Sequence, residues 1–202
     1  MAVRILVKQI KKIKRGQTRI DIEPFKLEFS SFYHNDNNEI CGIKELAEAL
    51  YNPNCKLTDL RISYNELSDA ETEVIAQILQ QKYCKLITIS FANNNIFVDG
   101  AKSIAKALQH ENCKLTTINL ARNNISCAGT EAIALALQHK NCKLTYINLA
   151  RNNISYAGIK AIALALQHEN CKLTYINLAR NNISYAGIKA IALALQHENC
   201  KL

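Results

Sequence analysis

Apolar side chains follow two patterns along this chain, and residues 142–170 show both. In the first half of this stretch apolar residues alternate with polar or small ones, which predicts a short strand with one buried face. In the second half they fall at i, i+3, i+4 and i+7, which predicts a helix of about three turns. The strand set is Leu144, Ile147, Leu149 and Ile154, and the helix set is Ile159, Ile162, Ala163 and Leu166.

The same pattern returns every 29 residues. Residues 171–199 repeat 142–170 without a change, and residues 113–141 differ from them only at Thr117, Cys127, Thr130, Glu131 and Lys140. Cys-Lys-Leu marks the start of each unit, at Cys55, Cys84, Cys113, Cys142, Cys171 and Cys200. A repeat of this length indicates a solenoid. Because each strand is followed by a helix, successive strands are expected to run parallel.

One such unit cannot fold alone. Burying about half a dozen apolar side chains contributes roughly 1.5–3 kcal/mol each. Ordering the unit costs about 1–2 kcal/mol per residue in backbone entropy. Each unit therefore depends on contacts with its neighbours.

Every unit carries the spacing L-x-x-L-x-L-x-x-N-x-L, followed in most units by a glycine. In 142–170 the residues that carry it are Leu144, Ile147, Leu149, Asn152, Ile154 and Gly158. This spacing resembles the leucine-rich repeat family, in particular its ribonuclease-inhibitor-like subtype. The resemblance covers residues 55–202, as five clear repeats and the start of another. It implies an α/β solenoid of horseshoe shape, with parallel strands on the concave face and helices on the convex face.

The N-terminal segment 1–26 differs from the repeats in charge. It holds eight Lys or Arg and two acidic residues, and thus most of the net charge of +8. As a helix, residues 1–15 would set an apolar face against a basic one, which suits an anionic membrane surface or an acidic partner. As a hairpin that turns at Arg15-Gly16-Gln17, the segment would cap the first repeat. The residues alone leave both interpretations open.

Residues 27–54 are predicted to form a degenerate capping repeat. Gly42–Leu50 aligns with Gly187–Leu195 and predicts a helix, and the strand before it is placed near residues 26–29. In the first clear unit Ser68-Asp69-Ala70-Glu71 replaces the glycine and has the spacing of a capping box.

Six of the eight cysteines recur once per unit, which predicts a column of small buried side chains. A single cysteine per unit has no evident pairing partner, so reduced thiols and a cytoplasmic location are expected, in the protein's own cell or in a host cell if it is delivered there. A histidine stands three residues before four of these cysteines, at His110, His139, His168 and His197. Because zinc needs about four converging ligands and the repeat itself forces this spacing, we expect no metal site.

Two sets of repeated polar residues are candidates for structure and binding. An asparagine follows each strand, and these are expected to form a structural ladder that satisfies backbone groups of the turns: Asn65, Asn94, Asn123, Asn152 and Asn181. Outward positions beside the strands are expected to form columns on the concave face, because adjacent strands lie about 4.8 Å apart. The predicted partner-binding residues are Tyr146, Tyr175, Asn119, Asn148, Asn177, Arg122, Arg151 and Arg180.

These patterns favour a protein-binding scaffold that uses its concave face, with no cofactor. Tyrosine and arginine often carry interface energy, and the arginine column would suit an acidic surface on the partner. No phosphate-binding glycine loop and no nucleophile or carboxylate pair stands outside the repeat, so catalysis is not expected. Alternative interpretations are association with a membrane surface through residues 1–15, a less favoured association with nucleic acid, or a truncated repeat fragment without independent function. The C-terminal unit has no polar closing cap, which predicts either a longer array or self-association.

Overall fold

The computed structural model of the protein describes residues 17–21 and 41–202. The predictions for the basic segment 1–15 and for a strand near residues 26–29 lie outside the described residues. The boundary between residues 26 and 27 stays a prediction.

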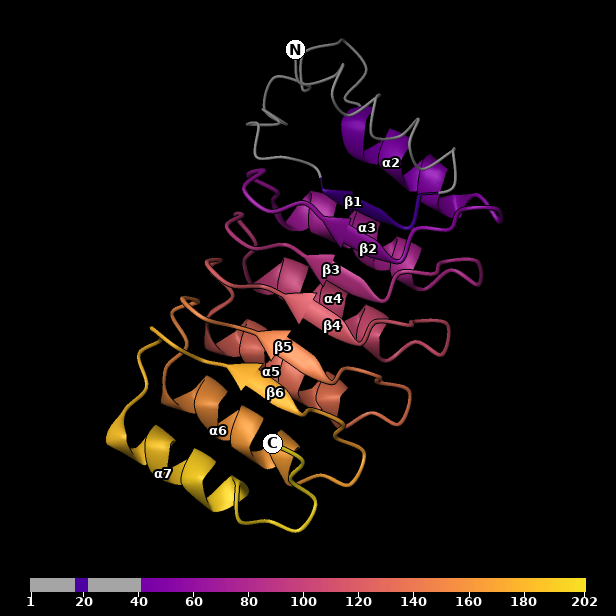
Figure 1. Ribbon diagram of the computed structural model, residues 1–202. Helices are drawn as coiled ribbons and strands as arrows, with labels where there is room; N and C mark the ends of the chain where they lie inside the picture. Colours follow the sequence, from indigo (N-terminus) through magenta and orange to yellow (C-terminus); the bar gives the residue numbers. More distant parts are fainter. Residues whose placement is uncertain (1–16, 22–40) are drawn as a thin grey trace.

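Strands and helices alternate through the whole described part of the chain (Figure 1). The strands are β1 (Arg19–Asp21), β2 (Asp59–Arg61), β3 (Thr88–Ser90), β4 (Thr117–Asn119), β5 (Tyr146–Asn148) and β6 (Tyr175–Asn177). The helices are α2 (Cys41–Tyr51), α3 (Asp69–Leu79), α4 (Val98–Leu108), α5 (Ser126–Leu137), α6 (Tyr156–Leu166) and α7 (Tyr185–Ala194). None of these helices has both the length and the apolar character that crossing a bilayer requires.

The strands form one parallel sheet in chain order, β1 to β6, and from β2 onward the register advances by one unit per strand. The central residue of each strand from β2 to β5 points inward and is fully buried: Leu60, Ile89, Ile118 and Ile147. The helices line the opposite side of the stack (Figure 1). Strands lie about 4.8 Å apart and packed helices about 8–10 Å apart, so the sheet takes the shorter, concave arc. The predicted α/β leucine-rich repeat solenoid is confirmed.

Helix α3 begins with the predicted capping box. The Ser68 hydroxyl accepts a hydrogen bond from the Ala70 N–H at 3.3 Å, and the Glu71 carboxylate accepts one from the Ser68 N–H at 2.9 Å. These bonds satisfy two of the donors that a helix start leaves open. The local sequence therefore replaces the glycine of the later units with a different way of starting the helix.

A column of buried thiols lies on the side of the sheet where the strands begin. Cys55, Cys84, Cys113, Cys142 and Cys171 are each at most 6% exposed, and all have free thiols. Burial is the main cause that raises the pKa of Cys84, Cys113, Cys142 and Cys171. These thiols are protonated at neutral pH and act as small apolar groups in the core.

The asparagines after the strands connect each unit to the one before it. Asn94 Oδ1 accepts from the N–H groups of Asn65 and Leu67 at 2.9 and 3.0 Å, and its Nδ2 donates to the carbonyls of Ile62 and Phe91 at 3.0 and 2.8 Å. Asn181 makes the same four bonds three units later. These bonds satisfy buried backbone groups that no strand or helix pairs. At the start of the ladder, Asn65 Oδ1 is buried and has no hydrogen-bond partner among the described residues.

A second ladder, which the sequence analysis did not predict, lies near the helix ends. The side-chain amides of four asparagines donate to glutamine carbonyls of the preceding unit at 3.0–3.1 Å, at Asn112, Asn141, Asn170 and Asn199. The signal in the sequence was an asparagine as the last residue of every unit from 84–112 to 171–199. The stack is thus hydrogen-bonded through side chains at both ends of its helices.

Two glycines in identical sequence allow a test of helix packing. A Cβ on Gly158 would lie 2.6 Å from Ile154 Cγ2 and 3.2 Å from Thr130 Cβ, whereas a Cβ on Gly187 would meet its nearest neighbours at 3.1 and 3.2 Å. We expect Gly158→Ala to lower the free energy of unfolding by about 1–3 kcal/mol through overpacking. For Gly187→Ala the gain in helix propensity offsets the less severe steric contact of the added Cβ. We therefore expect little change in the free energy of unfolding. Urea denaturation of both variants measures the difference, and equal effects would contradict the packing argument.

Replacing a ladder asparagine should destabilise the stack. Asn94→Ala leaves buried N–H and C=O groups of two units without partners, so we expect a loss of about 2–4 kcal/mol in the free energy of unfolding. The control is Asn124→Ala, because Asn124 is exposed in the next turn and accepts only a side-chain bond from Asn153. Its cost should stay within about 0.5 kcal/mol. Denaturant melts of both variants give the comparison.

Candidate functional site

The two tyrosines of the concave face stack on each other. Their ring centroids lie 4.5 Å apart and the rings are nearly parallel, at 1°. Tyr146 and Tyr175 occupy the same place in β5 and β6, and the register between these strands brings them together. Burial, followed by the neighbouring Tyr175 hydroxyl, raises the pKa of Tyr146, so this phenol is neutral at physiological pH. Tyr175 is 46% exposed and presents the outer face of the pair to solvent.

Beside the tyrosines runs a row of half-buried asparagines. The Oδ1 atoms of Asn119, Asn148 and Asn177 accept hydrogen bonds from backbone N–H groups two residues later, at 2.9–3.0 Å. These bonds fix the orientation of each amide and use its acceptor. The Nδ2 groups take no acceptor from the described residues, so the row offers hydrogen-bond donors at the spacing of the strands.

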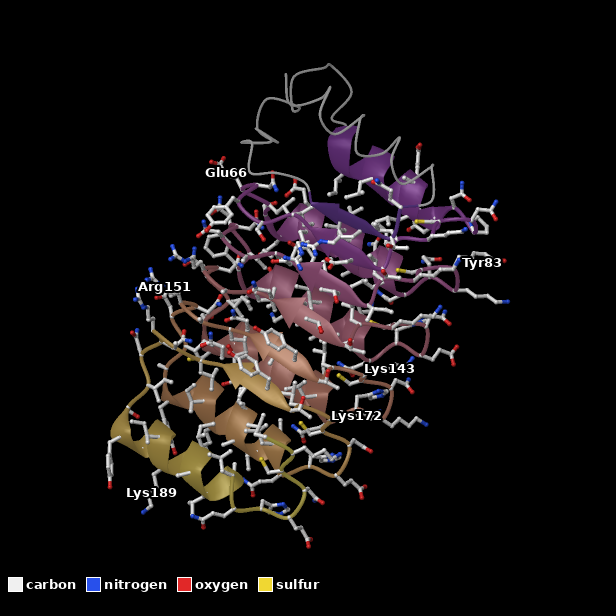
Figure 2. All side chains as sticks on the ribbon, in the orientation of Figure 1. Glu66, Tyr83, Lys143, Arg151, Lys172 and Lys189 are labelled. Atoms are coloured by element: carbon white, nitrogen blue, oxygen red, sulfur yellow. The ribbon has the colours of Figure 1, made fainter. Side chains whose placement is uncertain are left out.

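The arginines lie beside this surface and not within it. Arg122, Arg151 and Arg180 each have φ near +58° and occupy the loops that follow the strands. The N–H groups of Arg122 and Arg151 donate to the alanine carbonyl of the next unit at 2.8 and 3.0 Å. Figure 2 shows Arg151 on the same side as Glu66, at the edge where the strands end. The predicted column therefore borders the tyrosines and asparagines instead of sharing their strands.

The opposite edge of the sheet carries a lysine column that the sequence analysis missed. Lys143 and Lys172 lie there in Figure 2, across the strands from Arg151. Each extends its Nζ to a cysteine carbonyl of the preceding unit at 3.0 Å, and Lys201 does the same at 2.9 Å. The sequence signal was the Lys of each Cys-Lys-Leu tripeptide. In the last units, basic side chains thus border the concave strands on both sides.

The N-terminal end of the concave face has a different character. Asp59 on β2 lies between Arg19 and Arg61, at 3.9 and 3.3 Å, and these groups are partly exposed. Exposed ion pairs of this kind contribute little to stability. Along the sheet the outward side chains change from charged on β1 and β2, through threonine on β3 and β4, to tyrosine on β5 and β6.

The repeated histidines have a structural hydrogen bond. Nδ1 of His110, His139, His168 and His197 accepts the backbone N–H two residues later, at 3.2–3.3 Å. All four histidine side chains are half-buried. Among the described residues, no three His, Cys, Asp or Glu side chains gather in a way that could hold a metal ion.

One cysteine outside the buried column has an unusual environment. Cys127 Sγ lies 2.9 Å from Ser155 Oγ and accepts the Ser155 N–H at 3.3 Å. Two units earlier Asp69 takes the same place, and its carboxylate accepts the Phe97 N–H at 2.7 Å. Burial disfavours the Cys127 thiolate, but the hydrogen bonds from Ser155 and the Gly158 backbone outweigh it and lower the pKa of the thiol.

We expect Cys127 to react before the cysteines of the buried column. A lowered pKa gives more thiolate at neutral pH, whereas the raised pKa values and the burial of Cys113 and Cys142 protect those thiols. Timed iodoacetamide labelling followed by peptide mass spectrometry gives the order. Ser155→Ala removes one donor and should slow labelling of Cys127 while leaving Cys142 unchanged. If Cys142 reacts as fast as Cys127 in the folded protein, the assignment is wrong.

Comparison with known proteins agrees with this architecture. The sequence profile described as a leucine-rich repeat matches residues 54–70, 111–134, 140–163 and 169–192. A solved structure titled leiomodin-1 actin-binding site 2 is similar at a TM-score of 0.52 and 19% identity, over 71% of this chain and 76% of that one. The tropomodulin C-terminal domain of Caenorhabditis elegans is similar at a TM-score of 0.56 and 12% identity, over 80% of this chain and 91% of that one. No curated protein sequence gives a match.

The likeness to these two structures shows the fold, at identities too low to transfer a binding partner. Repeat spacing, parallel strand register, the helix in every complete unit and the family profile all agree. By its sequence profile over these residues and by its fold, the chain is a protein with leucine-rich repeats.

Proposed function

We propose that the protein is a scaffold that binds a partner protein through the concave face of its last three units. The contact surface consists of Tyr146 and Tyr175 with the asparagine row Asn119, Asn148 and Asn177. The arginine column Arg122, Arg151 and Arg180 engages acidic groups of the partner at the border of this surface.

The stacked tyrosines are the observation that carries the proposal. A rigid aromatic pair offers a large contact area and loses little side-chain entropy on binding, because its neighbours already hold it in place. Tyrosines in such positions are typical centres of binding energy. Their outer face is open to solvent, at 46% exposure for Tyr175.

The surrounding polar groups indicate the chemistry of the partner. The amide Nδ2 groups of the asparagine row would donate to carbonyl or carboxylate oxygens. The arginines and lysines on the two edges would attract an acidic surface and speed its association. The surface therefore suits a protein segment with exposed backbone carbonyls and acidic side chains on its flanks.

Two further observations support a protein partner in a reducing compartment. The similar leiomodin-1 structure is titled an actin-binding site, so that domain of the same fold binds a protein. The seven cysteines whose side chains the structure describes have free thiols, which suits the cytoplasm. The same fold is typically a binding scaffold without catalytic groups of its own.

Affinity capture with matched variants tests the proposal. The double variant Tyr146→Ala, Tyr175→Ala should reduce the captured partner about tenfold or more, because it removes the aromatic centre. The control is Tyr156→Ala, Tyr185→Ala, which removes two exposed tyrosines from the starts of α6 and α7 on the convex side. Circular dichroism verifies the fold of each variant.

A separate variant tests the contribution of the arginine column. Arg122→Glu, Arg151→Glu, Arg180→Glu should weaken capture and make the remaining binding less sensitive to salt. Equal capture by the intact chain and both concave variants would refute the proposal. Loss of capture only after deletion of residues 1–15 would assign binding to the basic N-terminal segment instead.

A further inference from the structure

The asparagine row of the concave face holds hydrogen-bond donors that the protein leaves free. In Asn119, Asn148 and Asn177 the Oδ1 atom already accepts the backbone N–H two residues later, at 2.9–3.0 Å. This bond fixes the orientation of each amide, and the Nδ2 group has no acceptor among the described residues. A partner that covers the row must supply acceptors, because a donor that is buried without one is costly.

The need for acceptors limits the conformation of the partner. Main-chain carbonyls in an α-helix or a β-sheet are mostly paired already. In a polyproline II segment no main-chain carbonyl has an internal partner. Such a segment can therefore satisfy the asparagine donors with its backbone, whereas a helix would have to use side chains alone.

The spacing of the asparagines agrees with this conformation. The register of β4, β5 and β6 sets Asn119, Asn148 and Asn177 side by side. Adjacent strands lie about 4.8 Å apart, so the outer two asparagines are separated by about 9.6 Å. A polyproline II segment has three residues per turn, and groups on one side of it recur about every 9.3 Å. In an extended strand they recur about every 6.8 Å, which fits neither one strand step nor two.

The arginine column keeps the same spacing and lacks acidic partners. The N–H groups of Arg122 and Arg151 donate to alanine carbonyls of the next unit, which continues the strand pairing as far as the arginines. None of the guanidinium groups of Arg122, Arg151 and Arg180 forms an ion pair with a described residue. Acidic groups at this spacing would relieve the repulsion within the column. Acidic side chains at every third position of a polyproline II segment lie on one side of it and can face the arginines.

The tyrosine pair borders the asparagine row on the other side. Along each of the last two units the tyrosine stands two residues before the asparagine, and the arginine three residues after it. Stacking holds the rings of Tyr146 and Tyr175 with their centroids 4.5 Å apart. Aromatic side chains are typical contacts of proline-rich segments. Because both the tyrosine pair and the segment are stiff before they meet, binding costs little conformational entropy.

We propose that the concave face binds an acidic, proline-rich segment in the polyproline II conformation, which crosses β4, β5 and β6. Main-chain carbonyls of the segment accept hydrogen bonds from the asparagine row. Its prolines contact the tyrosine pair, and acidic residues at every third position face the arginine column. This inference rests on the proposed function and narrows the partner to one kind of segment.

Fluorescence anisotropy of labelled synthetic peptides with the intact chain tests the inference. The probe is a (Glu-Pro-Pro) repeat of about 12 residues, which is about 37 Å long as polyproline II. We expect it to bind with a Kd of about 100 µM or lower. A (Glu-Ala-Ala) repeat of equal length has the same charges in the same order, and should bind at least about fivefold more weakly because it lacks the preformed conformation.

A matched pair of variants tests the asparagine donors. Asn148→Asp keeps an acceptor for the Ala150 N–H and removes the Nδ2 donor, so it should weaken binding of the (Glu-Pro-Pro) peptide at least about fivefold. Asn124→Asp is the control, because it adds the same charge in an exposed turn where Asn124 acts only as an acceptor. Circular dichroism verifies that both variants are folded.

Each contrary outcome has a definite meaning. Equal binding of the (Glu-Pro-Pro) and (Glu-Ala-Ala) peptides would overturn the polyproline II conformation, and equal loss in the two aspartate variants would overturn the role of the asparagine donors. If no peptide binds while Tyr146→Ala, Tyr175→Ala still loses its captured partner, this inference fails and the proposed function stands. If that double variant changes neither peptide binding nor capture, both fail.

Discussion

The whole structure depends on hydrogen bonds between neighbouring units, because each unit has buried backbone groups that only the next unit can pair. The turn after each strand leaves backbone N–H and C=O groups buried, and the asparagine of the next unit reaches back to satisfy them. A second asparagine does the same near the helix ends. Because both bonds span one fixed period, every unit must keep its length. The exact identity of residues 142–170 and 171–199 is compatible with this constraint, since a perfect copy preserves every partner.

The same constraint determines where the chain can vary. Inward strand positions stay aliphatic along the array, as at Leu60, Ile118 and Ile147, because each contributes to one continuous core. Outward positions one residue before them change from Asp59 through Thr117 to Tyr146 without altering the register. The concave face can therefore acquire binding chemistry at little cost to the fold, and here its aromatic part lies in the last two strands. This freedom is the physical basis for the proposal that the binding surface lies on those strands.

The chain also shows how position alone changes the role of one sequence. Ile159 is core and Ile188 is surface, although their units are identical. Gly158 is tightly enclosed and Gly187 less so for the same reason. In a solenoid the environment of a side chain is set by the units on both sides of it, so identical residues need not have identical functions.

The sequence by itself determined the repeat, the parallel strands and the helices. It also indicated that the asparagine after each strand would form a structural ladder. These features follow from apolar periodicity and from a fixed length, which both lie within a short stretch of chain. The strand of one unit, predicted around Ile147 and Leu149, is observed at Tyr146–Asn148. The tertiary structure decided the rest, because a side chain's direction depends on backbone dihedrals and on atoms one unit away. Only the structure shows that the arginines lie in the loops, where their φ is positive. It also shows that the two tyrosines stack and that Ser155 contacts Cys127, 28 residues earlier in the chain.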